Sequence, residues 1–411
     1  MKKISLLSLL VYLTLGVFAQ IKPELSLSGN FVNISEFRQG YKTILAADAD
    51  PAFVISQRSR LILDYKSEKF DFRFSVQDAR AWGETYIINS SKAVLMHEAW
   101  MRYNLNRDFN FTIGRQAIKY GDERIFSDRN WSIYGAAHDA GIFRYNRNKL
   151  ELDFGYALNS ANSGILENTA YSINNYQSMS WLWASKEFSS DIKINFINLM
   201  AFYQKPGTLT NYGLNTLGIN PVIKKFGFGF DGAAYFQFGK NKNGNHHQAH
   251  IYTANLDYSI QFLEVGAGYD HYSGKKYSDL SAKDKHFVQI METIPHGFLG
   301  FMDFDKGSQF KSPYGISDLN FYLKYGKKTT FAAYYHALAY AEEMEEGISR
   351  KIGNEFDFLI THKFGSNHTL NVGYSFMLPH DDLVLKALGT GIEASFAHWA
   401  WVKVTFNPKF L

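Results

Sequence analysis

The sequence predicts an all-β protein, a transmembrane antiparallel β-barrel of about 18 strands with short periplasmic turns and long extracellular loops. Three observations support this fold class. Aromatic residues make up 17% of the chain, with 35 Phe and 26 Tyr, yet they are scattered singly among polar residues. Apolar and polar residues alternate in many segments, and the connections between these segments alternate between short and long.

The alternation has a period of two residues. In FDFRFSVQ (70–77), one face carries Phe70, Phe72 and Phe74, and the other carries Asp71 and Arg73. Successive side chains of a strand point to opposite faces, so each such segment forms a strand with one apolar face. Most of the segments are close to the roughly 9–11 residues that a strand needs to cross a bilayer. The predicted strands are 24–38, 52–65, 70–82, 92–105, 109–118, 138–145, 149–159, 178–188, 191–203, 211–219, 226–239, 247–258, 261–272, 316–325, 330–339, 353–364, 369–378 and 392–406.

The connections between the strands fall into two classes. The short ones are 66–69, 106–108, 146–149, 189–190, 326–328 and 365–368. The long ones are 39–51, 83–91, 119–137, 160–177, 273–315, 340–352 and 379–391. Short turns at the periplasmic end, long loops at the outer end and an even number of strands are typical of outer-membrane barrels. A soluble β-sandwich has no reason to sort its loops by length.

The two faces of each strand have different expected environments. Every backbone amide within hydrocarbon must be paired, so strands cross a membrane only as a closed barrel. We therefore expect the face rich in Phe, Leu and Tyr to meet lipid and the charged face to line a water-filled lumen. The last segment, HWAWVKVTFNPKFL, is typical of a closing strand, although the chain ends in Leu411 with Phe410 one residue earlier.

The N-terminal residues 1–19, MKKISLLSLLVYLTLGVFA, predict a secretory signal peptide, because a basic start and an apolar run precede a small-residue cleavage site. The alternative, an uncleaved anchor, conflicts with the shortness of the run. We expect residues 20–411 to form a single barrel domain in the bacterial outer membrane, with no plug before its first strand. Without Cys the chain has no disulfides or thiolates, and a net charge of +4 does not indicate a nucleic-acid partner.

Arginine is unevenly distributed along the chain. Of 13 arginines, 12 lie between Arg38 and Arg147, and Arg350 is the other. A guanidinium pairs bidentately with carboxylate, phosphate or sulfate, so an arginine-rich wall predicts anion selectivity. The alternative is that these arginines pair with lumen carboxylates and only stiffen or plug the barrel. The residues expected on the lumen face are Arg58, Arg60, Arg73, Arg102 and Arg144, with Asp71 and Glu98 among them.

The segment GRQAIKYGDERIFSDRNW (114–131) begins at the outer end of the fifth strand and continues into a long loop. Its balanced charges cost little in a wet pore mouth, and its glycines permit the bends of a loop folded into the pore. Arg115 shares the parity of Phe111 and Ile113, which directs it toward lipid unless a bulge near Gly114 turns it inward. The candidate pore residues of this segment are Arg115, Lys119, Asp122, Glu123, Arg124 and Arg129.

Several short motifs in the N-terminal third resemble the alginate export family of outer-membrane channels. They are Gly114-Arg115-Gln116, Tyr120-Gly121-Asp122 with Arg124, Trp131, His138-Asp139-Ala140, and the segments QRSRL (57–61) and HEAWMRY (97–103). The remainder of the chain matches mainly in strand count and layout. The resemblance implies an eighteen-stranded barrel whose arginine-lined, loop-covered lumen conducts a polyuronate outward. It also implies that the pore arginines are Arg58, Arg60, Arg73, Arg102, Arg115, Arg124, Arg129 and Arg144.

Two other clusters of charged or metal-binding residues can be interpreted either as binding sites or as ordinary solvated loop residues. The histidines of HHQAH (246–250) are a metal-site candidate, but a solvated loop end is the simpler interpretation. The acidic run EEMEE (342–346) is either a cation site bridging lipopolysaccharide or a solvated loop tip. Asp122 and Glu123 are adjacent on an extended chain and point apart, so they do not suggest acid/base catalysis. No Ser–His arrangement indicates an esterase, and we expect no enzyme, no metal and no cofactor.

The function expected from the sequence is a monomeric passive channel for anionic solutes, with export of an acidic, alginate-like polysaccharide as its specific form. Its partners would be outer-membrane lipid, the solute, and periplasmic export proteins. Two alternatives stay open: a porin-like uptake channel for small carboxylates, and an adhesive barrel with a closed lumen whose loop 273–315 binds an outside partner.

Overall fold

A computed structural model describes residues 23–84, 94–159, 175–205, 207–289, 296–306 and 313–411. The predicted signal peptide lies outside these residues, as do 85–93 and most of the predicted loop 160–177. The predicted loop 273–315 is described except for 290–295 and 307–312. Within the described part of the chain, no helix is long and apolar enough to cross a membrane.

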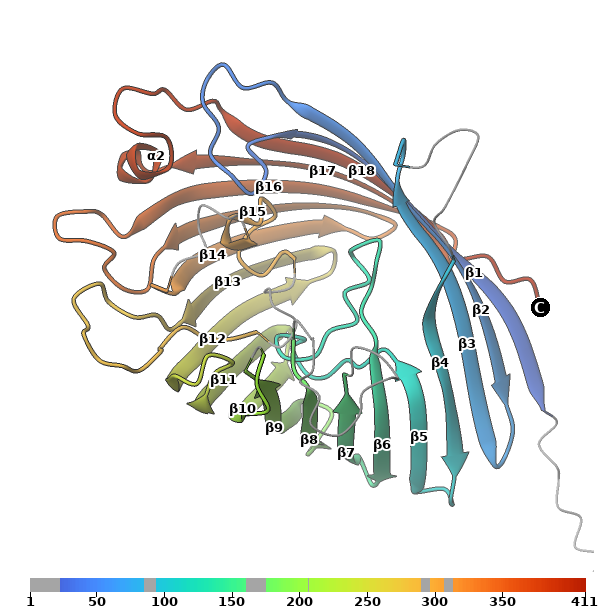
Figure 1. Cartoon of the computed structure of the whole chain (residues 1–411). Helices are drawn as coiled ribbons and strands as arrows, with labels where there is room; N and C mark the ends of the chain where they lie inside the picture. The colour runs from blue at the N-terminus through green and yellow to red at the C-terminus, as the bar shows by residue number, and fades with distance from the viewer. Residues whose placement is uncertain (1–22, 85–93, 160–174, 206, 290–295, 307–312) are drawn as a thin grey trace, which may run out of the picture.

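The described residues form one closed antiparallel barrel of 18 strands, as the sequence predicts (Figure 1). Each strand pairs with the next along the chain, and β1 closes the barrel against β18 in a register from Phe31↔Phe406 to Gln39↔His398. A short helix and a 3-10 turn lie in the loops. The elements are β1 (Glu24–Gln39), β2 (Ala52–Lys66), β3 (Phe70–Ala81), β4 (Leu95–Asn104), β5 (Phe109–Gln116), β6 (His138–Arg147), β7 (Leu150–Leu158), β8 (Ser178–Glu187), β9 (Ile192–Gln204), β10 (Asn211–Lys225), β11 (Phe228–Lys240), β12 (His246–Ile260), β13 (Leu263–Tyr272), η1 (Phe304–Lys306), β14 (Ile316–Gly326), β15 (Thr329–Ala339), β16 (Lys351–Phe364), β17 (His368–Pro379), α2 (Asp381–Leu388) and β18 (Ala397–Phe406).

Two of the predicted strand boundaries differ from the structure by five or six residues, more than any other boundary. The strand predicted to end at 219 continues to Lys225, because β9 keeps pairing through Pro221 while the pairing with β11 skips Asn220 and Pro221. A proline is tolerated where the ladder is interrupted in this way. The last strand begins at Ala397 rather than 392, because residues 393–395 bond to loop residues 45–47 instead of β17.

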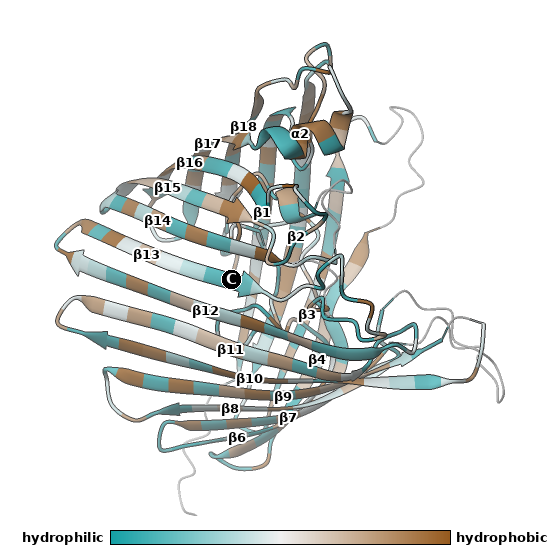
Figure 2. Cartoon of the chain, turned by 90° about the vertical axis from the view of Figure 1, so that its left-hand side faces the viewer, coloured by the Kyte–Doolittle hydropathy of each residue, from teal (hydrophilic) through white to brown (hydrophobic). Residues whose placement is uncertain are grey.

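As the sequence predicts, the apolar face of each strand points outward and the charged face points into the lumen. Along β7 the outward Phe154 is 60% exposed, while its inward neighbour Asp153 is 2% exposed. The same alternation of hydrophobic and hydrophilic residues follows the strands around the barrel (Figure 2). The outer surface is apolar, whereas the inner face carries charged residues such as Asp153 together with buried aromatic residues such as Trp181 and Trp399. Apolar residues facing outward and charged residues facing inward place this protein in the outer membrane.

Candidate functional site

The loop that follows β5, residues 117–137, folds into the lumen (Figure 1). It is held there by apolar side chains: Phe126 is fully buried against Trp181 of β8, with ring centroids 5.2 Å apart. Tyr120 stacks on Trp183 of the same strand at 4.8 Å. The left-handed backbone of Gly121, with φ of 54°, makes the bend that brings these side chains to the wall. We call residues 117–137 the inward loop.

A buried ionic brace ties the inward loop to strands further around the barrel. Arg124 Nη2 donates to Asp270 Oδ1 of β13 at 2.7 Å, and Arg124 Nη1 donates to the Tyr272 hydroxyl at 3.2 Å. Asp122 lies 3.3 Å from Arg124 and accepts a hydrogen bond from the Tyr235 hydroxyl of β11 at 2.6 Å. Burial alone would lower the pKa of Arg124, but Asp270 and Asp122 hold it above its ordinary value. The guanidinium is therefore charged and compensated where it is buried.

Cations on the wall bind the backbone of the inward loop from the other side. Arg58 Nη1 donates to the Ser132 carbonyl at 2.9 Å, and Lys403 Nζ donates to the Trp131 carbonyl at 3.0 Å. Arg60 donates to the Gln77 side chain at 2.7 Å and to the Asn130 side chain at 3.2 Å. Among the residues that the structure describes, Arg58, Arg60 and Lys403 form no ion pair. Their charges are fixed in position but not neutralised by a contacting carboxylate.

These cations border a chamber of about 770 Å³ in the periplasmic half of the lumen. Its position follows from Ser28, Asn30 and Asn407, which lie toward the end of the barrel that carries the short turns. Among the residues that the structure describes, eight Lys or Arg residues line it against two carboxylates, Glu98 and Asp128. The cations are Arg58, Arg60, Arg73, Arg102, Lys119, Arg144, Lys403 and Lys409.

A second chamber of about 770 Å³ occupies the extracellular half. Asp128 and Asn130 line both chambers, so this part of the inward loop lies between them. The charges that the described residues bring to the extracellular chamber are balanced, with four cations and four carboxylates. They are Arg38, Lys42, Arg129, Lys306, Glu36, Glu123, Asp128 and Asp303.

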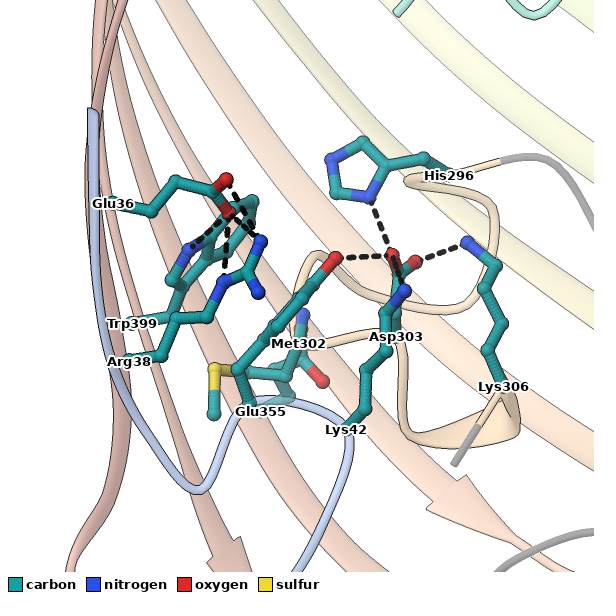
Figure 3. Close-up of polar contacts among 10 residues, drawn as sticks. Glu36, Arg38, Lys42, His296, Met302, Asp303, Lys306, Glu355 and Trp399 are labelled. Atoms are coloured by element: carbon teal, nitrogen blue, oxygen red, sulfur yellow. Dashed lines mark hydrogen bonds and ion pairs between the residues drawn. The ribbon is translucent and has the colours of Figure 1, made fainter. Parts of the chain in front are cut away.

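Part of this chamber is built by residues 296–306, a second segment that enters the lumen (Figure 3). Its backbone is fixed by Glu355, which accepts from the Met302 amide at 2.7 Å. Asp303 accepts from the Tyr41 hydroxyl at 2.9 Å and contacts His296 Nδ1 at 3.0 Å and Lys306. Burial would raise the pKa of Asp303, but His296 and Lys306 hold it below its ordinary value. The His296 ring also packs on Trp131, at 3.8 Å between centroids, so the two inward segments touch.

The predicted pore residues separate into four groups. Seven line the periplasmic chamber: Arg58, Arg60, Arg73, Glu98, Arg102, Lys119 and Arg144. Glu123 and Arg129 line the extracellular chamber. Asp122 and Arg124 form the buried brace and border neither chamber. Arg115 was wrongly assigned to the pore: it keeps the outward parity of its strand and pairs with outward Asp139 at 3.0 Å, because β5 pairs with β4 without a register shift at Gly114.

Some lumen arginines are paired with carboxylates and others are not. The paired ones fit the stiffening interpretation of the arginine wall, and the unpaired ones fit the anion-selectivity interpretation. Arg144 pairs bidentately with Asp153 at 2.7 and 2.6 Å, and Arg73 pairs with Asp64 at 2.7 Å. Arg102 lies 3.6 Å from Asp71. These pairs stiffen the wall, whereas Arg58 and Arg60 keep an unneutralised charge beside the chamber.

Sequence reasoning missed Lys403 of the last strand, Lys409 beyond it, and the second inward segment. Lys403 follows the inward parity of Trp399 and Trp401, so strand alternation could have identified it. His296 and Lys306 lie in a loop without periodicity, and no local signal places them in the lumen.

The other clusters form no composite site. Within the described part of the chain, no group of three His, Cys, Asp or Glu side chains is arranged to hold a metal. The histidines of HHQAH diverge, because His247 is buried on the inner face while His246 is exposed. In EEMEE, Glu343 pairs with Lys276 at 2.7 Å.

Solved structures identify the architecture. The chain is similar to OccK11 (OpdR) of Pseudomonas aeruginosa, at 12% identity and a TM-score of 0.61 over 95% of this chain and 96% of that one. The likeness to OccK5 (OpdH) of the same organism is 10% identity and a TM-score of 0.63, over 94% and 99%. The chain is also similar to Acinetobacter baumannii OccAB3, at 13% sequence identity and a TM-score of 0.61. This similarity covers 94% of this chain and 100% of OccAB3.

This is the fold of the Occ outer-membrane porins. No protein-family model matches the sequence, and no curated protein matches it either. The resemblance to the alginate export family is therefore not supported, and the motifs that suggested it belong to a barrel of the Occ architecture. The closed barrel of eighteen antiparallel strands agrees with this architecture.

Proposed function

We propose that this protein is a passive outer-membrane channel that admits small anionic solutes, carboxylates in particular, rather than an enzyme or a polysaccharide exporter. The observation that carries the proposal is the excess of cations around the periplasmic chamber, where the described residues include eight Lys or Arg and two carboxylates. Rings of positive charge are the usual device for anion selectivity in pores. One chain is sufficient for one channel in this proposal, since the described strands of a single chain close the barrel.

The unneutralised guanidinium groups supply the binding chemistry. Arg58 bonds to the Ser132 carbonyl and Arg60 bonds to the Asn130 side chain, and these contacts with the inward loop hold both guanidinium groups extended. Each terminal nitrogen of a guanidinium carries two N–H groups, so a second donor at these nitrogens can pair with a carboxylate. The paired Arg73 and Arg144 keep the wall stiff without adding an open anion site. A solute thus meets binding groups strong enough to admit it and few enough to release it.

The segmented lumen favours small solutes. Each chamber measures about 770 Å³, and the inward loop around Asp128 and Asn130 lies between them. A long polymer would have to pass both inward segments in an extended form. We therefore favour uptake or exchange of small carboxylates over export of a polyuronate.

The test is conductance of the purified barrel in a planar bilayer under a KCl gradient. We expect an anion-favouring reversal potential and a concentration-dependent block by small dicarboxylates such as succinate. The double variant Arg58→Glu/Arg60→Glu should shift the reversal potential toward cations. A silent bilayer from protein shown to be folded by heat-modifiable gel mobility would favour the closed, adhesive barrel instead.

A further inference from the structure

A depression of about 320 Å³ lies on the outer face of the barrel, where β13, β14 and β15 reach the extracellular rim. Its walls and floor come from two rows of paired outward residues. The deeper row is Tyr269–Leu319–Ala337, and the row nearer the rim is His271–Ser317–Ala339. Ala341 and Arg350 complete it from the loop that joins β15 to β16.

The depression exists because four of its side chains are small. Ser317, Ala337, Ala339 and Ala341 form its floor, while the neighbouring Tyr269 and Leu319 stand 46% exposed each. Elsewhere on the outer face, Phe and Leu side chains fill the corresponding positions, as Phe321 and Leu323 do further along β14. A groove in this band faces the outer leaflet, so an acyl chain can lie in it.

The rim of the depression carries Arg350 and a pair of stacked histidine rings, with the carboxylate of Glu342 close enough to act on both rings. Arg350 donates through Nη1 to the Ala341 carbonyl at 2.8 Å, and it forms no ion pair among the residues that the structure describes. His271 contacts Ser317 through Nδ1 at 2.9 Å and stacks on His250 of β12, with centroids 5.5 Å apart. The nearby Glu343 is neutralised by Lys276. Tyr269, beside these rings, is the kind of side chain found at the level of lipid headgroups.

We propose that this groove binds one phosphorylated acyl lipid of the outer leaflet, with an acyl chain on the small-residue floor and a phosphate against Arg350. The site explains two features that the channel does not use. Arg350 is the single arginine of the C-terminal two thirds of the chain, and His250 belongs to the HHQAH motif. A guanidinium at the headgroup level pairs bidentately with phosphate, and apolar contact below it adds affinity with each buried methylene.

The proposal is tested by native mass spectrometry of the full barrel in detergent, with hexaacyl lipid A as the probe. We expect one lipid A per wild-type barrel. Ala337→Phe, which fills the floor, should weaken this binding by about tenfold or more, and Arg350→Gln should weaken it by about tenfold. Ser317→Leu fills the same floor and replaces Ala337→Phe if that variant does not fold by heat-modifiable gel mobility.

Two control variants test whether any loss of lipid A binding is specific to the groove. Ala184→Phe adds the same ring at an outward alanine of β8, and Lys205→Gln removes one charge from another extracellular loop. Both should bind lipid A as the wild type does. Phosphatidylcholine and inorganic phosphate should each bind at least tenfold more weakly than lipid A.

Three outcomes would overturn the proposal. One is unchanged lipid A binding in the floor-filling variants. Another is equal binding of phosphatidylcholine with no effect of Arg350→Gln. The third is a dimer that Ala337→Phe abolishes, which would make a second copy of this chain the occupant.

Discussion

Arg124 on the inward loop and Asp270 on β13 lie 2.7 Å apart, although 146 residues separate them in the sequence. Both side chains are almost completely buried, at 4% and 2% exposure. Their pairing ties the inward loop to the wall at β13. It also makes the loop sensitive to loss of either partner, because the remaining charge would be buried alone.

The first prediction concerns this pair. Arg124→Gln should destabilise the barrel by about 3–5 kcal/mol and raise single-channel conductance, because Asp270 is left unpaired and the inward loop loses its brace. Thermal unfolding and bilayer recordings measure the two effects. In the double variant Arg124→Gln/Asp270→Asn, part of the lost stability should return. Wild-type stability and conductance in the single variant would show that the pair does not hold the loop.

The second prediction separates charge from geometry at Arg60. Arg60→Gln should lower anion preference in reversal-potential measurements, since it removes an unneutralised charge from the periplasmic chamber. Arg60→Lys should keep the reversal potential but weaken block by succinate several-fold, because an ammonium lacks the planar pair of donors. Arg107→Gln, in an exposed periplasmic turn, is the control and should change neither quantity. Equal block in Arg60→Lys and wild type would argue against bidentate binding.

The third prediction tests the packing of the inward loop on the barrel wall, where Phe126 contacts Trp181. A methyl group at Gly155 would lie 2.0 Å from the Trp181 ring, so Gly155→Ala must displace that ring. Because Phe126 packs on Trp181, we expect a lower unfolding temperature and a larger, more variable conductance. Gly141→Ala on the neighbouring strand is the matched control, since its added methyl meets Phe111 at an ordinary 3.4 Å. Similar behaviour of the two variants would contradict the steric argument.

The fourth prediction is a pH dependence at Asp305, which lies between Asp303 and Lys306 of the extracellular chamber in the sequence but does not itself line the chamber. Burial raises the pKa of Asp305 to about 7, with Lys306 opposing the shift. The carboxyl is therefore neutral below that pH and gains a negative charge above it, beside Lys42 and Lys306. Anion preference should fall as pH rises from about 6 to 8, and Asp305→Asn should remove this change. A pH profile that Asp305→Asn leaves intact would assign the titration to another group.

Local sequence patterns were sufficient for the fold. Alternation with a period of two depends only on neighbouring residues, so the strands, their faces and the inward positions of Arg58 and Arg60 could be predicted. The parity of Arg115 correctly predicted an outward side chain, whereas the family resemblance and the possible bulge at Gly114 had placed it in the pore. Strand ends were less predictable where a partner strand decides them, as at Pro221, because that partner lies elsewhere in the sequence.

By itself the sequence determined a closed eighteen-stranded barrel with an apolar outer face and an arginine-rich lumen. The physical reason is that backbone amides in hydrocarbon must all be hydrogen-bonded within the protein, and strands achieve this only in a closed barrel. The tertiary structure decided which arginines are neutralised, which loops enter the lumen and where the two chambers lie. Those properties depend on contacts such as Arg124 with Asp270 and His296 with Trp131, which join residues far apart in the chain. They follow from how side chains fill the interior, and no local periodicity encodes that.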